Sequence, residues 1–218
     1  MSTARGGGRT VQPRGRARAR SRGHALRLRP RRSGQRLYRT VARPDLTGIL
    51  LVGGASSRFG SPKALARLKG ESLAERAWRV IGETCAHRLA VGKAEELVEL
   101  ELAVLDDGTE VRTAMAGLVA GVRAATTDVS VVVPVDMPLL TPALLLELAD
   151  ACADAAVPQT GPLPGAYSKR ALPVLERRLA EGRFALREAL DELDTKRLEL
   201  NDSLLVNVNT KDELRRLG

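Results

Sequence analysis

The stretch LTGILLVGGASSRFGSPK, residues 46–63, joins a short apolar run to a glycine-rich segment that ends in a lysine. The apolar residues 46–52 predict a buried strand, and two glycines follow directly after it. Glycine allows the backbone to turn sharply and to bring its N–H groups against the phosphates of a ligand. Arg58 and Lys63 add two positive charges, which suits a triphosphate. The stretch therefore predicts a phosphate-binding loop, and the alternative is an ordinary glycine-rich turn with two solvated cations.

Strand and helix signals alternate along the chain after this loop. Further strands are expected at residues 88–91, 100–105, 129–135, 155–157, 165–167, 197–200 and 204–206. Helices are expected at residues 72–86, 113–125, 141–153, 169–181 and 184–193, with a brief helical stretch from Ala94 and a terminal helix from Thr210. Strands that alternate with helices at this spacing imply right-handed crossovers. The sequence therefore predicts an α/β fold with three layers, α/β/α, around a mostly parallel, Rossmann-like sheet.

Four of these helices begin with side chains that can cap the first backbone N–H groups, and Thr113 is one of these caps. Ser72 with Glu75, and Thr210 with Glu213, have the spacing of a capping box. Thr141 offers an N-cap that is followed by a proline at the first helical position.

Acidic residues follow two of the predicted strands, at the edge of the sheet where ligands bind in such folds. Asp136 comes directly after the β-branched run at residues 129–135, in the segment PVDMP. Mg²⁺ prefers one or two carboxylates together with phosphate oxygens, so Asp136 is the expected metal ligand. Asp106 and Asp107 end another strand and could reach the same place. For each acid the alternative is a structural role in capping the following turn.

Other catalytic chemistries have little support. The glycine-rich loop lacks the Gly-Lys-Ser/Thr ending of a Walker A motif and the G-x-G-x-x-G of a dinucleotide fingerprint. His24 and His87 do not resemble a catalytic pair, and no serine lies in a G-x-S-x-G segment. Hydrolase chemistry is therefore not expected.

The net charge of +9 is distributed very unevenly. Residues 1–44 hold 14 arginines and no acid, whereas residues 45–218 hold 21 basic and 26 acidic residues, a net charge of −5. The first segment is rich in Arg, Gly and Pro without a sustained apolar period, so we expect a disordered N-terminal extension and a single domain at residues 45–218. We favour an extension without function. An arm that touches nucleic-acid phosphates and an organelle transit peptide are the alternatives.

The amino-acid composition also indicates the cellular compartment and the residues that form the hydrophobic core. Cys85 and Cys152 lack a CxxC spacing and predict buried thiols in a reducing compartment, so the expected location is the cytoplasm. No run approaches the 18 apolar residues of a membrane span, and no membrane contact is expected. Because aromatic residues make up only 2% of the chain, the core must consist of Leu, Val, Ile and Ala, which suits a parallel sheet covered by helices.

Several segments together resemble a known family. The pattern L-x-G-G-x-S-x-R-[MF]-G-x-x-K is matched by Leu51, Gly53, Gly54, Ser56, Arg58, Phe59, Gly60 and Lys63. This pattern is similar to the nucleotide-binding loop of the GT-A-like small-molecule nucleotidyltransferases. The D-M-P at Asp136 and the late VNVNTKDEL at residues 206–214 resemble the bacterial molybdenum cofactor guanylyltransferases. The resemblance covers about residues 46–217 in the right order and implies a fold of the nucleotide-diphospho-sugar transferase type.

The resemblance implies roles for individual residues. The residues that it assigns to GTP binding in and near the loop are Leu51, Val52, Gly53, Gly54 and Lys63. It implies that Asp136 binds Mg²⁺ beside the α-phosphate, and that Asp106 or Asp107 contacts the nucleotide. It also implies that Asn207 and Asn209 line the pterin side.

We therefore expect a Mg²⁺-dependent guanylyltransferase in which a phosphate oxygen of molybdopterin attacks the α-phosphorus of GTP and pyrophosphate leaves. The expected catalytic residues are Asp136, Lys63 and Arg58. Mg²⁺ on Asp136 would polarise the α-phosphate, while the two cations would offset charge on the leaving group. Transient contact with molybdoenzyme apoproteins or chaperones is a further expectation.

The sequence departs from the family pattern in several places. Phe59 replaces the methionine of the R-M-G element, and the segment at residues 113–117 replaces the family's G-P-L-x-G. The asparagine expected after the second strand is replaced around Lys93, and the segment between Val157 and Tyr167 is short.

These departures leave alternatives open. Within the same class, the alternatives are a molybdopterin cytidylyltransferase and another small-molecule nucleotidyltransferase. The L-x-G-G and D-M-P elements resemble those of the guanylyltransferases more than those of the cytidylyltransferases, so the resemblance favours GTP over CTP. From a different class, the alternative is a nucleotide-binding partner protein that has lost catalysis.

Overall fold

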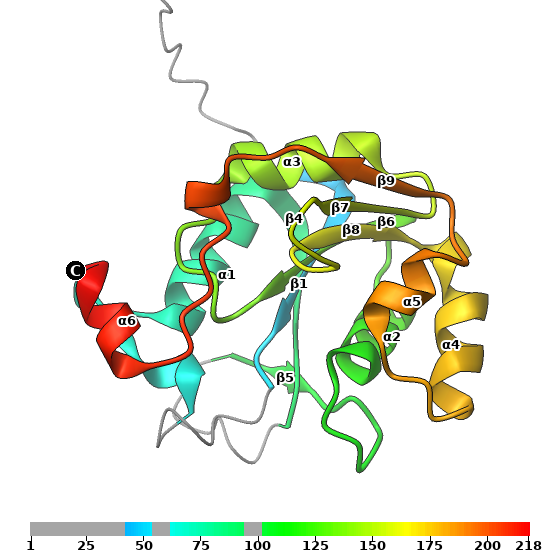
Figure 1. The fold of residues 1–218 in the computed structure, drawn as a ribbon, viewed down its shortest axis with the longest axis horizontal. Coiled ribbons are helices and arrows are strands. Elements are labelled where there is room, and N and C mark those ends of the chain that lie inside the picture. Colours follow the sequence, from blue (N-terminus) through cyan, green and yellow to red (C-terminus); the bar gives the residue numbers. More distant parts are fainter. Residues whose placement is uncertain (1–41, 54–61, 94–101) are drawn as a thin grey trace, which may run out of the picture. The chain divides into compact units, whose positions relative to one another are not determined.

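A seven-stranded sheet runs through the centre of the computed structural model, which describes residues 42–53, 62–93 and 102–218. Helices cover both of its faces (Figure 1). In spatial order the strands are β5 (Val104–Leu105), β4 (Cys85–Val91), β1 (Arg43–Leu51), β6 (Val129–Pro134), β8 (Gly165–Ser168), β7 (Ala155–Pro158) and β9 (Thr195–Leu198). β1 is parallel to both of its neighbours, β4 and β6. The expected three-layer fold with a mostly parallel sheet is confirmed.

Two hydrophobic clusters, one on each face, hold the helices to the sheet. One face carries α1 (Leu73–Thr84) and α3 (Pro142–Ala151), and the C-terminal α6 (Lys211–Arg216) adds Leu214 to the same cluster. The other face carries α2 (Ala114–Ala124), α4 (Leu172–Ala180) and α5 (Leu186–Leu190). In the part of the chain that the structure describes, no helix is long and apolar enough to cross a membrane.

Gly48 in β1 and Gly121 in α2 let helices approach the sheet closely on both of its faces. A Cβ at Gly48 would lie 2.0 Å from Cγ2 of Ile81 in α1. On the opposite face, a Cβ at Gly121 of α2 would lie 2.7 Å from Cγ2 of Ile49. Because successive strand residues point to opposite faces, Gly48 and Ile49 set the two helix-to-sheet distances separately. The ligand edge of β1 is thereby fixed between two packed layers.

The expected helix starts are confirmed. Ser72 and Glu75 form a complete capping box at α1, and Thr210 and Glu213 form another at α6. The Thr141 side chain accepts a hydrogen bond from the N–H of Leu144, with Pro142 at the first helical position. Helix ends were placed too late, since α1 ends at Thr84 and Cys85 already begins β4.

One strand of the sheet runs against the others. β8 is antiparallel to β6 and to β7, whereas β7 and β9 are parallel. Only residues 159–164 separate β7 from β8, and a parallel crossover needs a dozen or more residues. The short connection therefore forces a hairpin, and it leaves residues 159–164 at the same edge of the sheet as the carboxyl end of β6.

Smaller elements differ from expectation. The polar loop expected to run to about Gly70 contains instead a hairpin of β2 (Arg67–Leu68) and β3 (Glu71–Ser72). Lys69 and Gly70 between them both have positive φ, as a tight two-residue turn requires. The strand expected at residues 204–206 is wrong: the region holds the short 3-10 helix η4 (Asp202–Leu204) instead. The helical stretch expected from Ala94 lies outside the described residues.

The N-terminal part of the domain begins slightly earlier than expected. β1 starts at Arg43, whose guanidinium makes ion pairs with Asp45 and with Asp150 of α3. The division into an extension at residues 1–44 and a domain at residues 45–218 stays a prediction, because the structure does not describe residues 1–41. Both cysteines are free, and burial raises the pKa of the Cys85 thiol to about 12 and that of Cys152 to about 11.

Candidate active site

The carboxyl ends of the central strands meet at one edge of the sheet. Leu51, the last residue of β1, pairs with Val91 of β4 and with Pro134 of β6. The register continues past the strands, since the N–H of Val135 donates to the Leu51 carbonyl over 3.1 Å. The chain segments that leave these strands therefore start side by side.

A cavity of about 500 Å³ opens at this edge. Its floor is formed by residues 134–136, which follow β6. We call one side the β1 wall, which consists of Leu51, Val52, Gly53, Lys63, Val91, Gly92, Lys93, Asp107, Arg112, Thr113, Ala114 and Gly117. We call the other side the hairpin wall, which consists of Thr160, Gly161, Pro162, Leu163, Arg187 and Asn207. A cavity of this volume is typical of small-molecule sites.

Asp136 and Lys63 meet at the floor of the cavity. Lys63 begins the 3-10 helix η1 (Lys63–Leu65), and its Nζ lies 3.2 Å from Oδ2 of Asp136. The same Nζ donates to Oδ1 of Asn209 over 2.9 Å. Their side chains are partly buried, with 17% of Lys63 and 25% of Asp136 exposed. Three residues that the sequence predicted for the site are thus in direct contact.

The C-terminal segment is tied to the same floor. The N–H of Val208, which is buried, donates to the Asp136 carbonyl over 2.8 Å. This bond places Asn207 in the lining of the cavity, while the amide of Asn209 reaches Lys63. The two asparagines therefore lie close to Asp136, and their role on the pterin side stays a prediction.

The structure distinguishes Asp107 from Asp106. The Asp107 side chain is 7% exposed and lines the cavity, where its Oδ1 lies 2.6 Å from Nζ of Lys93. The Asp106 side chain is 56% exposed and accepts a hydrogen bond from the N–H of Gly108. This backbone hydrogen bond, with the charge of Lys93, lowers the pKa of the Asp106 carboxyl. Asp107 is therefore the acid that lines the cavity, while Asp106 shapes the turn.

Glycine is required where β1 and β4 end. A Cβ at Gly92 would lie 2.9 Å from the backbone nitrogen of Gly53, a contact that cannot be relieved by moving a side chain. Gly53 itself is not among the glycines with positive φ. The close approach of the two strand ends therefore explains the missing side chain at Gly92. A Cβ at Gly53 would lie 3.5 Å from the Gly92 Cα, an ordinary contact.

Helix α2 begins at the β1 wall. Thr113 caps it by accepting a hydrogen bond from the N–H of Ala116, and Ala114 and Gly117 line the cavity. A Cβ at Gly117 would lie 3.0 Å from Leu51, so the helix start presses against the end of β1. Residues 113–117 differ from the family's G-P-L-x-G, yet helix α2 still begins beside the cavity.

The donors at Asp136 fit a Mg²⁺ ion that a nucleotide brings with it. Within the described ranges, no group of three or more His, Cys, Asp or Glu side chains is arranged to hold a metal. Mg²⁺ is commonly bound by one or two carboxylates, with phosphate oxygens and water filling its other positions. Asp136, at the end of a buried strand and beside Lys63, meets that requirement.

Two predicted site residues, Gly54 and Arg58, lie outside the described residues. The sequence did not single out residues 160–163, Arg112 or Arg187 as parts of the site. It treated Lys93 only as a departure from the family pattern, and Thr113 as a helix cap within such a departure. Their positions after the ends of β4, β5 and β7 are a signal that could have found most of them, because ligands bind at the carboxyl ends of such strands. Arg187, within α5, has no such signal.

The chain is similar to several known proteins over most of its length. The model of the MobA-like NTP transferase domain matches residues 48–197. The chain is 31% identical to a probable molybdenum cofactor guanylyltransferase of Bacillus subtilis, over 76% of this chain and 90% of that protein. It is 32% identical to a probable molybdenum cofactor guanylyltransferase of Chloroflexus aggregans, over 78% and 92%. The structure of the molybdopterin-guanine dinucleotide biosynthesis protein A of Archaeoglobus fulgidus superposes with a TM-score of 0.69 at 26% identity, over 78% and 96%.

Proposed function

The chain belongs to the MobA-like NTP transferase family, and on that premise we propose that it transfers GMP from GTP to a phosphate of molybdopterin, releasing pyrophosphate. The observation that carries the proposal is the position of the Asp136 and Lys63 pair. It lies on the floor of one cavity, between two walls of different origin. Such a site can hold two substrates on either side of a reacting phosphate.

The nucleotide occupies the β1 wall in this proposal. The ends of β1 and β4 approach each other through Gly53 and Gly92, so their backbone is accessible to a ligand without intervening side chains. Asp107 offers a buried carboxylate to the hydroxyl or N–H donors of the nucleotide. Arg58 and Gly54 belong to the same proposal on the strength of the sequence motif alone.

The chemistry requires positioning and charge neutralisation rather than a covalent enzyme intermediate. A phosphate oxygen of the acceptor forms a bond to the α-phosphorus of GTP, the bond to the bridging oxygen breaks, and pyrophosphate leaves with the electron pair. Lys63 orients the phosphates and offsets negative charge that builds up during transfer. Asp136 would hold Mg²⁺, which, when bound, polarises the α-phosphate.

The acceptor lies against the hairpin wall and the C-terminal segment in this proposal. Asn207 lines that side of the cavity, and Asn209 holds Lys63. Cytoplasmic location and transient contacts with molybdoenzyme apoproteins or chaperones remain part of the proposal.

Pyrophosphate release by the purified protein tests the function. We expect release with GTP, Mg²⁺ and molybdopterin together, and none when either GTP or molybdopterin is left out. With CTP in place of GTP, kcat/KM should fall at least about tenfold, since a purine pocket leaves polar groups unpaired around the smaller base. Removal of Mg²⁺ with EDTA should stop release, and added Mg²⁺ should restore it.

The outcomes separate the alternatives. A preference for CTP would assign the chain to the cytidylyltransferases. Release with another phosphorylated acceptor but not with molybdopterin would make it a different small-molecule nucleotidyltransferase. GTP binding without release for any acceptor would indicate a nucleotide-binding protein that has lost catalysis.

A further inference from the structure

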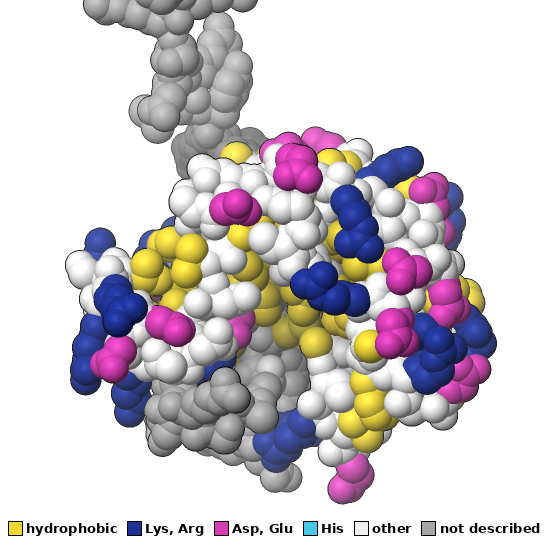
Figure 2. Space-filling model, viewed as in Figure 1, with side chains coloured by type: hydrophobic (Ala, Val, Ile, Leu, Met, Phe, Trp, Pro, Cys, Tyr) yellow, Lys and Arg dark blue, Asp and Glu magenta, His cyan; other side chains and the backbone are white. Residues whose placement is uncertain are grey.

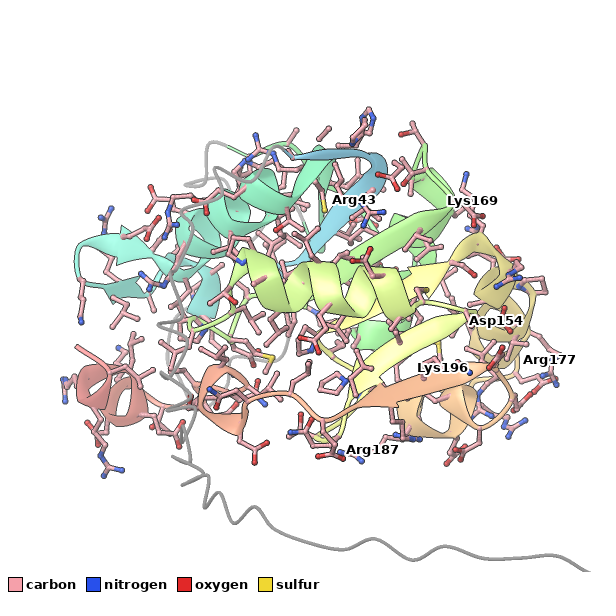
Figure 3. The ribbon with its side chains drawn as sticks, turned by 90° about the horizontal axis from the view of Figure 1, so that it is seen from above. Arg43, Asp154, Lys169, Arg177, Arg187 and Lys196 are labelled. Atoms are coloured by element: carbon pink, nitrogen blue, oxygen red, sulfur yellow. The ribbon has the colours of Figure 1, made fainter. Side chains whose placement is uncertain are left out.

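Arg187 is the cation of the hairpin wall. It lies on α5, away from Asp154, Lys169 and Arg177 (Figure 3). Its guanidinium lines the cavity together with residues 160–163. Nη2 of Arg187 donates to the Thr160 carbonyl over 2.6 Å, which joins α5 to the connection between β7 and β8.

The charge of Arg187 is compensated less than those of the lysines in the cavity. Nζ of Lys63 lies 3.2 Å from Asp136, and Nζ of Lys93 lies 2.6 Å from Asp107. Among the described residues, no carboxylate forms an ion pair with Arg187, whose partner is a neutral carbonyl. A guanidinium has five N–H donors in a planar fork, so most of its donors remain for a ligand. On the face seen in Figure 2, Lys and Arg side chains lie beside a central group of apolar side chains.

The helix that carries Arg187 is held rigidly. Leu186 and Ala189 are buried in the hydrophobic cluster of that face of the sheet. The fully buried side chain of Arg178 in α4 lies 2.5 Å from Glu188 and 2.6 Å from Glu192. The residues on either side of Arg187 are therefore anchored, so its guanidinium starts from a fixed backbone. A group that binds a substrate gains precision from such support.

We infer that Arg187 binds an anionic group of the acceptor and so helps to determine which acceptors the protein uses. This inference rests on the proposed function, because it takes the hairpin wall as the acceptor side. A phosphorylated acceptor carries negative charge into a wall whose cation has no carboxylate partner, and a guanidinium binds such oxyanions through paired hydrogen bonds. The anionic group is either the attacking phosphate or another acidic group of the acceptor.

Steady-state kinetics of Arg187→Gln and Arg187→Lys test the inference. For Gln we expect the KM of molybdopterin to rise about tenfold or more, with the KM of GTP unchanged, because a charged hydrogen bond is lost on the acceptor side alone. The Arg187→Lys variant should keep part of the affinity for molybdopterin, since lysine keeps the positive charge but lacks the planar, paired donors of a guanidinium. A fall in kcat together with the rise in KM would identify the attacking phosphate, whereas a rise in KM alone would identify another anionic group.

A matched control and a salt series separate charge from structure. Arg170→Gln removes one positive charge beside the far end of β8, where Arg170 pairs with Asp154, and should leave both KM values unchanged. The KM of molybdopterin should increase with NaCl in the wild type and in Arg170→Gln, but less steeply in Arg187→Gln, because screening acts on the lost attraction. Thermal unfolding and the Kd of GTP show whether each variant is folded.

The results distinguish this inference from the proposed function. A wild-type protein that releases no pyrophosphate with molybdopterin contradicts the proposed function. An active wild type whose Arg187→Gln variant keeps the KM of molybdopterin and its salt dependence contradicts the role of Arg187. A variant in which the KM of GTP rises as much as that of molybdopterin also overturns the inference, because its effect would not be confined to the acceptor.

Discussion

The β1 wall and the hairpin wall of the cavity come from two halves of the sheet that are built differently. The β1 wall lies at the ends of parallel strands, and its lysines face carboxylates, with Lys63 beside Asp136 and Lys93 beside Asp107. The hairpin wall lies beside an antiparallel strand, and the partner of Arg187 among the described residues is a backbone carbonyl. The two lysines of one wall are thus paired in advance with carboxylates, whereas the arginine of the other keeps most of its donors for what binds there.

Paired charges on the β1 wall have a further consequence. Lys63 and Asp136 hold each other in place before a nucleotide arrives, so the site is ordered in advance. A nucleotide with Mg²⁺ supplies both a cation for Asp136 and phosphates for Lys63, so it can replace the direct pair without leaving either charge alone.

Asp136→Asn should have the largest effect, because Asp136 lies on the floor between both walls. We expect the transfer rate to fall about a hundredfold or more, equivalent to about 2.7 kcal/mol, since a neutral amide is a poor Mg²⁺ ligand. The measurement is kcat at saturating GTP, molybdopterin and Mg²⁺. Asp191→Asn, at an exposed carboxylate on the C-cap of α5, is the control and should behave as wild type. A rate for Asp136→Asn close to that of the wild type would remove this residue from the mechanism.

Lys63→Ala should come next, and its effect should be confined to the β1 wall. We expect the Kd of GTP with Mg²⁺ to rise about tenfold and kcat to fall, because the lysine charge meets the phosphates both before and during transfer. Isothermal titration with GTP measures the first effect. Lys196→Ala, at an exposed lysine of β9, controls for the loss of one charge. An unchanged Kd would show that Lys63 serves the fold rather than the nucleotide.

Asp107→Asn and Asp106→Asn form a pair that tests the assignment of the two neighbouring acids. For Asp107 we expect the KM of GTP to rise about threefold to tenfold, the range for one lost hydrogen bond. For Asp106, whose carboxylate is exposed and bonded to a backbone N–H, we expect little change in the KM of GTP. The reverse order of effects would contradict the assignment of Asp107 to the nucleotide.

Removal of residues 1–44 should have the smallest effect, because neither wall includes them. A chain that begins at Asp45 should keep the wild-type kcat and both KM values. It loses the ion pairs of Arg43 with Asp45 and Asp150, which are partly exposed and contribute at most about 1 kcal/mol. Comparison with a chain that begins at Arg43, by thermal unfolding, isolates that contribution. A large drop in the unfolding temperature of both would mean that the removed segment packs on the domain.

The parallel half of the molecule was largely predictable from the sequence. Strands buried on both faces are nearly continuous apolar runs, so the sequence predicted β1, β6 and the place of Asp136 after the end of β6. Capping boxes placed the starts of α1 and α6. These signals are local, and they need no knowledge of what packs against them.

The hairpin half was predicted less well because its features depend on distant contacts. The antiparallel direction of β8 follows from the length of a connection rather than from any motif, so no local pattern predicted it. Arg187 and Thr160 meet across 27 positions of the chain. Nothing in the pattern of the short helix α5 distinguishes an arginine that lines a cavity from one that faces solvent.

The connection between β7 and β8 also has a consequence for how the substrate preference of such a protein can evolve. Residues 159–164 join two adjacent strands at the rim, whereas α1 and α2, which link the parallel strands, are packed into the core. A longer loop costs little, about 0.6 kcal/mol for each doubling of its length, while an altered core helix disturbs a close-packed interior. Residues 159–164 can therefore be replaced by another loop at little cost in stability. Grafting a related loop between β7 and β8 should alter which acceptor is used while the inherited nucleotide site stays as it is.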